Sequence, residues 1–169
     1  NHQIETLLER VMEPLVVMAS LAGATTAEQQ EGTDDLVWMA WRWLLLNHPH
    51  DDMYGCGIDA VHEEMAYRFS QAEQIANFLS RDNLRALTRH VDFTNQGGIP
   101  VIFVNSLNWE RDEITEVDID FDYDDPVADN FELVTSDGFP VPHQILSDEQ
   151  IFWMETLKAN RKRRVRILV

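Results

Sequence analysis

Apolar residues recur at steps of three and four along the beginning of the chain. The positions on this apolar face are Ile4, Leu7, Leu8, Val11, Leu15 and Met18. Such a period is typical of one face of an amphipathic helix. Pro14 lies inside the pattern and predicts a kink or a break, because proline has no amide hydrogen to donate to the helix.

A second helix is predicted after a small and polar stretch over residues 23–33, which is interpreted as a loop. Thr33 or Asp34 is a candidate N-cap for this helix, since a short side-chain oxygen can accept from the first free amides. The helix is expected to end near Asn47, because His48 precedes a proline and therefore disfavours helical geometry.

The tryptophans of this second helix predict how it packs. Trp38 and Trp41 are three residues apart and share a face, which favours core packing over stacking on a ligand. Trp43 points elsewhere and is a candidate contact with a neighbouring domain.

A third helix begins near Asp59, the candidate N-cap. Its apolar face contains Val61, Met65, Phe69, Ala72, Ile75, Ala76 and Leu79, and the pattern extends toward Val91. Amphipathic helices with short joints form bundles. Residues 1–95 are therefore predicted to be a three-helix bundle.

The periodicity changes after Gly97 and Gly98. Residues 100–104 form a short β-branched run, and residues 114–123 alternate between apolar and acidic positions, as a half-buried strand does. Further strands are predicted at residues 131–134, 141–146, 151–154 and 165–169. The fold class predicted is thus α+β, with a mostly antiparallel β region over residues 96–169.

Acidic residues on the alternating stretch raise the question of calcium. They are Asp118, Asp120, Asp122, Asp124 and Asp125. An EF-hand loop needs glycine at its sixth position and glutamate at its twelfth. Counted from Asp118, these positions hold Tyr123 and Asp129. The solvent-facing side of a strand is therefore favoured over a calcium site.

Charge and composition exclude several classes of partner. The net charge of −17 over 169 residues argues against binding to nucleic acid or to an anionic membrane surface. The one basic run, residues 161–164, is interpreted as a solvated loop before the last strand. No apolar run approaches the roughly 18 residues that a membrane-spanning helix needs.

Cys56 is the single cysteine, which excludes an internal disulfide and favours a reducing compartment. We interpret it as a small buried residue in a tight turn. The chain does not begin with methionine and ends on a strand-like Arg-Ile-Leu-Val. It is therefore expected to be a piece of a longer protein, located in the cytoplasm.

The densest group of chemically active side chains consists of His48, His50, Asp51 and Asp52, next to Pro49. Imidazole nitrogens and carboxylate oxygens are ligands of zinc and similar ions. A zinc site takes three or four protein ligands, so ligands from elsewhere would be needed. Two alternatives are a structural role at a helix end and turn, and a self-contained metal site using His48, His50 and Asp52.

Two motifs in order resemble one enzyme family. The first runs from Trp38 through Asn47, Pro49-His50-Asp51 and Gly55-Cys56 to Asp59 and Val61. It closely resembles the middle helical domain of glycoside hydrolase family 38, the α-mannosidases, whose bacterial-type members carry Asn-x-Pro-His-Asp here. The second, residues 101–111, resembles the opening of the C-terminal β-sandwich domain of the same enzymes. The likeness is strong over residues 36–70 and 99–117.

The resemblance implies roles for two residues. His50 matches the histidine that completes the zinc site, and Asp51 matches the aspartate that contacts hydroxyls of the bound mannose. It also implies a retaining, two-step hydrolysis of terminal α-mannosyl residues from oligosaccharides. The nucleophile, the acid/base carboxylate and the other zinc ligands lie in an N-terminal α/β barrel in this family. No catalytic residue is therefore expected in this chain, which should be inactive alone.

The partners implied are an α-mannoside substrate, the N-terminal barrel and the rest of the β-sandwich domain of the same polypeptide; a homo-oligomer stays open. His48 stands where relatives often carry glutamine and receives no metal role. The alternative function is a non-catalytic docking module built from a helical bundle and a β extension. The enzyme hypothesis requires that His50 and Asp51 be accessible to solvent, whereas the docking hypothesis does not.

Overall fold

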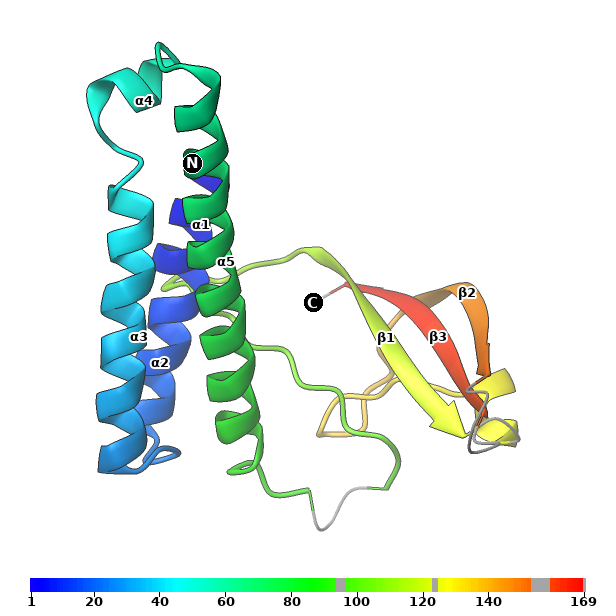
Figure 1. The fold of residues 1–169 in the computed structure, drawn as a ribbon. Coiled ribbons are helices and arrows are strands. Elements are labelled where there is room, and N and C mark those ends of the chain that lie inside the picture. Colours follow the sequence, from blue (N-terminus) through cyan, green and yellow to red (C-terminus); the bar gives the residue numbers. More distant parts are fainter. Residues whose placement is uncertain (94–96, 123–124, 153–158, 169) are drawn as a thin grey trace. The chain divides into compact units, whose positions relative to one another are not determined.

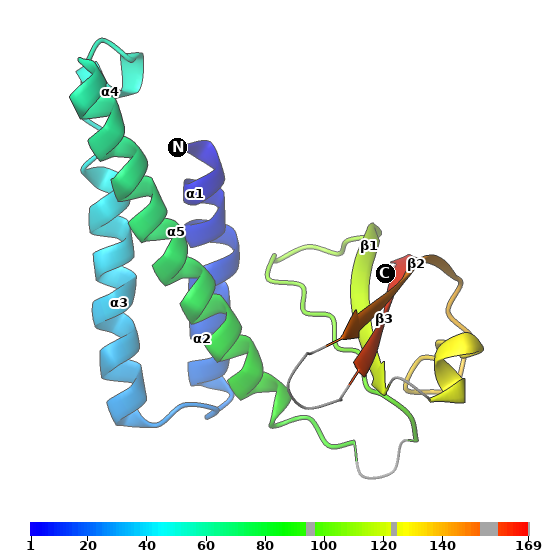
Figure 2. The same ribbon diagram turned by 45° about the vertical axis from the view of Figure 1, so that its right-hand side comes forward.

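The computed structural model describes residues 1–93, 97–122, 125–152 and 159–168, and it contains helices followed by an antiparallel sheet (Figures 1 and 2). This arrangement confirms the predicted α+β class. The chain divides into two compact units, Asn1–Asn108 and Trp109–Val169. The predicted boundary between residues 95 and 96 lies within residues 94–96, which are outside the described part, and residues 99–108 belong to the helical unit.

The first helix consists of α1 (His2–Leu7), the π-helix η1 (Leu8–Met12) and α2 (Glu13–Leu21). Pro14 explains the irregular middle part, because it cannot donate to the carbonyl of Arg10, four residues earlier. The hydroxyl of Ser106 donates to this carbonyl at 2.6 Å. The proline therefore alters the helix locally, and the predicted break does not occur.

The second helix, α3 (Ala27–Leu45), begins earlier than the sequence analysis predicted. Thr26 is its N-cap: the Thr26 hydroxyl accepts from the amide of Gln29, and the Gln29 side chain accepts from the amide of Thr26. This capping box satisfies two amides that the helix itself leaves free. The predicted loop is therefore confirmed over residues 23–26 and wrong over residues 27–33, and the predicted caps Thr33 and Asp34 are wrong.

The short helix α4 (His50–Tyr54) and the long helix α5 (Asp59–Thr88) complete the helical part. The N-cap of α5 is Ile58, not Asp59, and Asp59 is the first helical residue. A carboxylate in the first turn is favourable there because the amino end of a helix carries partial positive charge. Figures 1 and 2 show α3 and α5 running side by side, with α4 at the end where they are connected.

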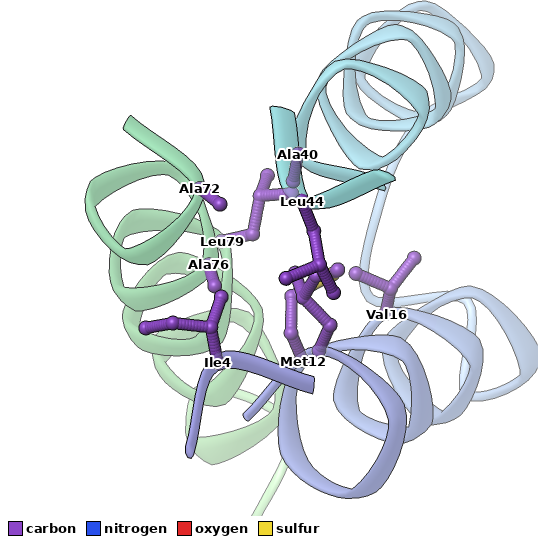
Figure 3. Close-up of a cluster of buried hydrophobic side chains, with 9 residues drawn as sticks. Ile4, Met12, Val16, Ala40, Leu44, Ala72, Ala76 and Leu79 are labelled. Atoms are coloured by element: carbon purple, nitrogen blue, oxygen red, sulfur yellow. The ribbon is translucent and has the colours of Figure 1, made fainter. Parts of the chain in front are cut away.

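The core of the bundle is apolar and draws on all of its long helices (Figure 3). It comprises Ile4, Leu8, Met12, Val16, Ala40, Leu44, Ala72, Ala76 and Leu79. The alanines at positions 40, 72 and 76 are fully buried, which lets α3 and α5 approach closely. Each large side chain removed from water contributes about 1.5–3 kcal/mol, so this cluster is the main source of stability in the unit.

Of the two tryptophans of α3 that were predicted to pack in the core, the prediction is confirmed for Trp41 and wrong for Trp38. Trp38 is 63% exposed, with the guanidinium of Arg42 over its ring at 5.4 Å. Trp41 and Trp43 both pack against the core, and Trp43 meets Tyr67 edge to face. Helical spacing groups residues on a face, but it does not say which edge of that face the neighbouring helices cover.

The sheet consists of β1 (Ile114–Asp122), β2 (His143–Phe152) and β3 (Ala159–Leu168), in the order β1-β3-β2 with antiparallel pairs. The predicted strands over residues 100–104 and 131–134 do not form; the second is reduced to an isolated bridge between Val134 and Pro140. Residues 141–146 and 151–152 contribute to one strand instead of two, and residues 153–154 lie outside the described part.

The two faces of β1 differ, as the alternation predicted. Ile119 and Phe121 are buried, and the carboxylates that alternate with them, Asp118, Asp120 and Asp122, are exposed. Asp118 accepts two hydrogen bonds from the guanidinium of Arg164, at 2.8 and 3.2 Å. These bonds hold the pKa of Asp118 below its usual range. A solvent-facing strand, not a calcium loop, accounts for Asp118, Asp120 and Asp122. Asp125 is the N-cap of the short 3-10 helix η2 (Pro126–Asp129), where it accepts from the amide of Val127 at 2.9 Å, and Asp124 lies outside the described residues.

The basic run over residues 161–164 belongs to β3, so the predicted solvated loop is wrong. The register of the β1–β3 pair places Asp118 opposite Arg164 and Glu116 opposite Arg166. Opposite charges facing each other across antiparallel strands stabilise the pairing. The sequence alone shows one acidic and one basic segment. Their antiparallel pairing places opposite charges next to each other, which explains why the basic segment is a strand and not a loop.

No helix among the described residues is long and apolar enough to cross a membrane.

Candidate functional site

The histidine–aspartate cluster lies in residues 46–58, which we call the site segment. It connects α3 to α5 and contains α4 (Figures 1 and 2). Pro49 is the N-cap of α4, and its φ of −52° and ψ of 143° turn the chain out of α3. Gly55 ends α4 in the left-handed conformation, at φ 70°. Proline and glycine therefore set both ends of this short helix, which the sequence analysis did not predict.

His50 and Asp51 are the first two residues of α4 and both face solvent. The side chains of His50 and Asp51 are 83% and 69% exposed, and His50 Nε2 lies 2.9 Å from Asp51 Oδ1. The enzyme hypothesis required this accessibility. The two side chains therefore lie together at the start of α4.

The contact with Asp51 favours one of the two tautomers of the His50 imidazole. A neutral imidazole carries one proton, and a carboxylate beside Nε2 favours the proton on that nitrogen. Nδ1 then keeps its lone pair and can bind a metal ion. The donor chemistry of His50 thus fits one ligand of a zinc site.

His48 and Asp52 turn away from this pair. His48 Nε2 lies 3.1 Å from Asn1 Oδ1, and Asp52 Oδ2 lies 4.0 Å from Arg68 Nη1. In the part of the chain that the structure describes, no group of three or more histidine, cysteine, aspartate or glutamate side chains could hold a metal ion. The structure therefore does not assemble the self-contained site of His48, His50 and Asp52.

Two residues that the sequence analysis did not select hold the site segment against α5. Asn47 is 1% exposed, and its Nδ2 donates to the carbonyl of Met65 at 3.1 Å. Arg68 donates to the carbonyl of Leu46 at 3.2 Å. Nothing in the sequence indicates these two hydrogen bonds. The partners of Asn47 and Arg68 lie about 20 residues away along the chain.

Cys56 follows Gly55 in the turn after α4 and is exposed. Its thiol lies 3.9 Å from the carbonyl of Tyr54, and its amide donates to the carbonyl of Asp51 at 3.0 Å. The predicted position in a turn is confirmed, but the predicted burial is wrong, because the side chain is exposed. The backbone bond to Asp51 closes the turn of α4 that carries the candidate site.

Comparisons with known proteins were made for the whole chain. No family model matches the sequence. A protein of Halalkalibacterium halodurans, provisionally named a mannosylglycerate hydrolase, is 38% identical over 73 residues, which are 43% of this chain and 7% of that protein. A solved structure of a glycosyl hydrolase family 38 protein from Enterococcus faecalis aligns with a TM-score of 0.74 and 23% identity, over 99% of this chain and 22% of its own.

A second solved structure, an α-mannosidase from Enterococcus faecalis V583, aligns with a TM-score of 0.67 and 21% identity. The alignment covers 98% of this chain and 20% of that structure. This chain thus spans about a fifth of the length of these solved proteins. The predicted resemblance to glycoside hydrolase family 38 is confirmed at the level of the fold.

Proposed function

We propose that this chain is part of a zinc-dependent, retaining glycoside hydrolase of family 38 that removes terminal α-mannosyl residues from its substrates. The observation that carries the proposal is the exposed pair of His50 and Asp51, held 2.9 Å apart on a fold that matches a family 38 structure over 99% of the chain. The relative from Halalkalibacterium halodurans is named a mannosylglycerate hydrolase, and the second solved structure is named an α-mannosidase, so both names refer to compounds of mannose.

In this proposal the site segment lends two side chains to an active site that is completed elsewhere in a longer polypeptide. His50 supplies one imidazole ligand, and the remaining ligands come from outside the described residues. A bound zinc ion supplies a Lewis acid that polarises oxygen atoms of the sugar. Asp51 holds the imidazole ring of His50 in place through its contact with Nε2. Carboxylates commonly orient metal-binding histidines in this way.

Asp51 has a second free oxygen with which it can accept hydrogen bonds from sugar hydroxyls. Bonds to an ionised carboxylate are stronger than those between neutral groups. Asp51 therefore binds and orients the mannosyl group, while the nucleophile and the acid/base group of a retaining mechanism lie in another domain. We expect the isolated chain to hydrolyse nothing.

The test uses the full-length polypeptide that contains this chain. In His50→Ala we expect loss of bound zinc and loss of hydrolysis of an aryl α-mannoside. The matched control is His90→Ala, because His90 is exposed at the far end of α5, where its Nδ1 lies 3.1 Å from the carbonyl of Ala86. The control should keep both zinc and activity.

Asp51→Asn separates the two roles. It should bind zinc more tightly than His50→Ala does, because the imidazole ligand is still present, although the loss of the carboxylate that orients this ligand weakens zinc binding. It should also lose about 10- to 100-fold in kcat/KM, since a hydrogen bond to a charged group contributes about 1.5–3 kcal/mol. Comparing mannosylglycerate with a mannose disaccharide then identifies the group that follows the mannosyl residue. Unchanged zinc and turnover in His50→Ala would overturn the proposal and favour the docking module.

A further inference from the structure

The site segment lacks the apolar anchoring that holds the rest of the bundle. Helix α4 has no buried residue, and Asn47 is the one buried residue within residues 46–58, all of which the structure describes. Met53, Tyr54 and Ile58 are 59%, 82% and 72% exposed. The direction in which His50 and Asp51 point must therefore be set by polar contacts.

Arg68 of α5 contacts the site segment on both sides of His50. Its Nη1 donates to the carbonyl of Leu46 at 3.2 Å and lies 4.0 Å from Asp52 Oδ2. Its Nη2 donates to Glu64 Oε2 at 2.6 Å, which fixes the guanidinium from one turn earlier in α5. Because the guanidinium is planar and rigid, it can hold several partners in a set geometry.

The partners of Arg68 are the kind that a cation stabilises. The carbonyl of Leu46 is at the C-terminal end of α3, where carbonyls lack helical donors and the helix dipole favours positive charge. The side chain of Asp52 is 14% exposed and that of Arg68 is 23% exposed. Their attraction is thus less screened than that of a surface pair.

Asn47 provides the second fixed point. Its Nδ2 donates at 3.1 Å to the carbonyl of Met65, one turn before Arg68. The amide of the next residue, His48, donates to the carbonyl of Leu45 at 3.0 Å. The chain is therefore fixed to α5 immediately before Pro49, and Pro49 in turn restricts the backbone that leads into His50.

We infer that Arg68 and Asn47 are positioning residues that fix the direction of His50 and Asp51. The inference rests on the proposed function, and it adds residues that touch neither metal nor sugar. Changes in groups that orient a metal ligand typically cost 10- to 100-fold in metal affinity. Small displacements of binding groups are also expensive for catalysis, because the reacting atoms then miss their geometry.

The experiment compares Arg68→Met with Arg81→Met in the full-length polypeptide. Both changes remove one positive charge from α5, but Arg81 is exposed and its Nε donates within the helix, to the carbonyl of Asn77 at 3.3 Å. Zinc affinity is measured by competition with a chelator, hydrogen exchange is followed at the amides of residues 47–56, and kcat and KM are determined separately.

In Arg68→Met we expect zinc affinity to fall by about 10- to 100-fold and exchange in residues 47–56 to accelerate, with a melting temperature close to that of Arg81→Met. Arg68→Lys should restore part of the affinity, because an ammonium group can reach one of the partners as a point charge. Asn47→Asp, which replaces the amide donor by a carboxylate, should accelerate exchange in the same segment.

Equal zinc affinity and equal exchange in the two Arg→Met variants would overturn the inference. A fall in melting temperature without recovery in Arg68→Lys would also overturn it, because Arg68 would then support the fold in general. The proposed function fails on a different result, retention of zinc in His50→Ala. Exchange in residues 47–56 reports on positioning whether or not zinc binds.

Discussion

The interior of the bundle and the site segment adjoin each other on the same two helices, yet different contacts hold them in place. Leu44 in α3 is fully buried among apolar side chains. Asn47 is three residues further along, is 1% exposed, and is held by a hydrogen bond to Met65. The transition from apolar packing to polar anchoring thus occurs within one helical turn.

This difference matters because the two kinds of contact fix different things. Apolar burial is proportional to area and has no preferred direction, so it stabilises the bundle and tolerates small shifts. Hydrogen bonds depend on distance and angle, so they fix the direction of the groups that they hold. A segment that presents His50 and Asp51 to solvent has little area to bury, and the polar contacts of Asn47 and Arg68 supply the precision.

The largest effect on stability is expected in the apolar core of the bundle. Leu44→Ala should lower the free energy of unfolding of the helical unit by about 2–5 kcal/mol, since it removes buried methyl groups and leaves a cavity. Urea unfolding of the chain, followed by circular dichroism at 222 nm, measures this loss. Leu45→Ala is the matched control because Leu45 is 54% exposed on the same helix. A similar loss in both variants would contradict the apolar core described here.

A smaller effect is expected at the end of α4, where backbone conformation decides. Gly55 has φ 70°, and a Cβ there would meet no atom within 4 Å, so Gly55→Ala pays only the cost of the left-handed conformation, about 1–2 kcal/mol. Gly32 lies inside α3 with open space around it. Gly32→Ala should therefore stabilise the chain, by about 0.4–1 kcal/mol. The two substitutions should therefore change the free energy of unfolding in opposite directions. Urea unfolding of the two variants side by side measures both changes.

The smallest effect on stability is expected in the sheet, where β1 has apolar packing on one face and polar cross-strand contacts on the other. The pKa of Asp118 is lowered by its hydrogen bonds to Arg164. A lowered pKa stabilises the folded chain above the ordinary value of about 3.9, and this stabilisation is lost as the pH falls through the lowered pKa. Because Asp118 is at the surface, we expect a small change in stability.

Titration of the Asp118 carboxyl carbon by NMR measures this shift directly. Its midpoint should lie below the ordinary aspartate value of about 3.9, because the hydrogen bonds from Arg164 favour the charged form. In Arg164→Gln the midpoint of Asp118 should rise toward the ordinary value. An unchanged midpoint in that variant would mean that the cross-strand pair does not hold the carboxylate in solution.

Local signals in the sequence were sufficient for most of the regular structure. The apolar period of three and four residues predicted the long helices, and strict alternation predicted β1. One local signal was overlooked: Thr26 and Gln29 have the spacing of a capping box and place the start of α3 correctly. Pro49 and Gly55 likewise mark both ends of α4, because their backbone preferences act without any partner.

The sequence by itself determined the long helices, the α+β class and the position of His50 and Asp51 in the segment between two long helices. Only the tertiary structure decided which side of the tryptophan-bearing helix is covered, that the basic run pairs with an acidic strand, and that Asn47 and Arg68 secure the candidate site. Local preferences depend on a few neighbouring residues, whereas these contacts join residues far apart in the chain. Such contacts exist only once helices and strands have packed.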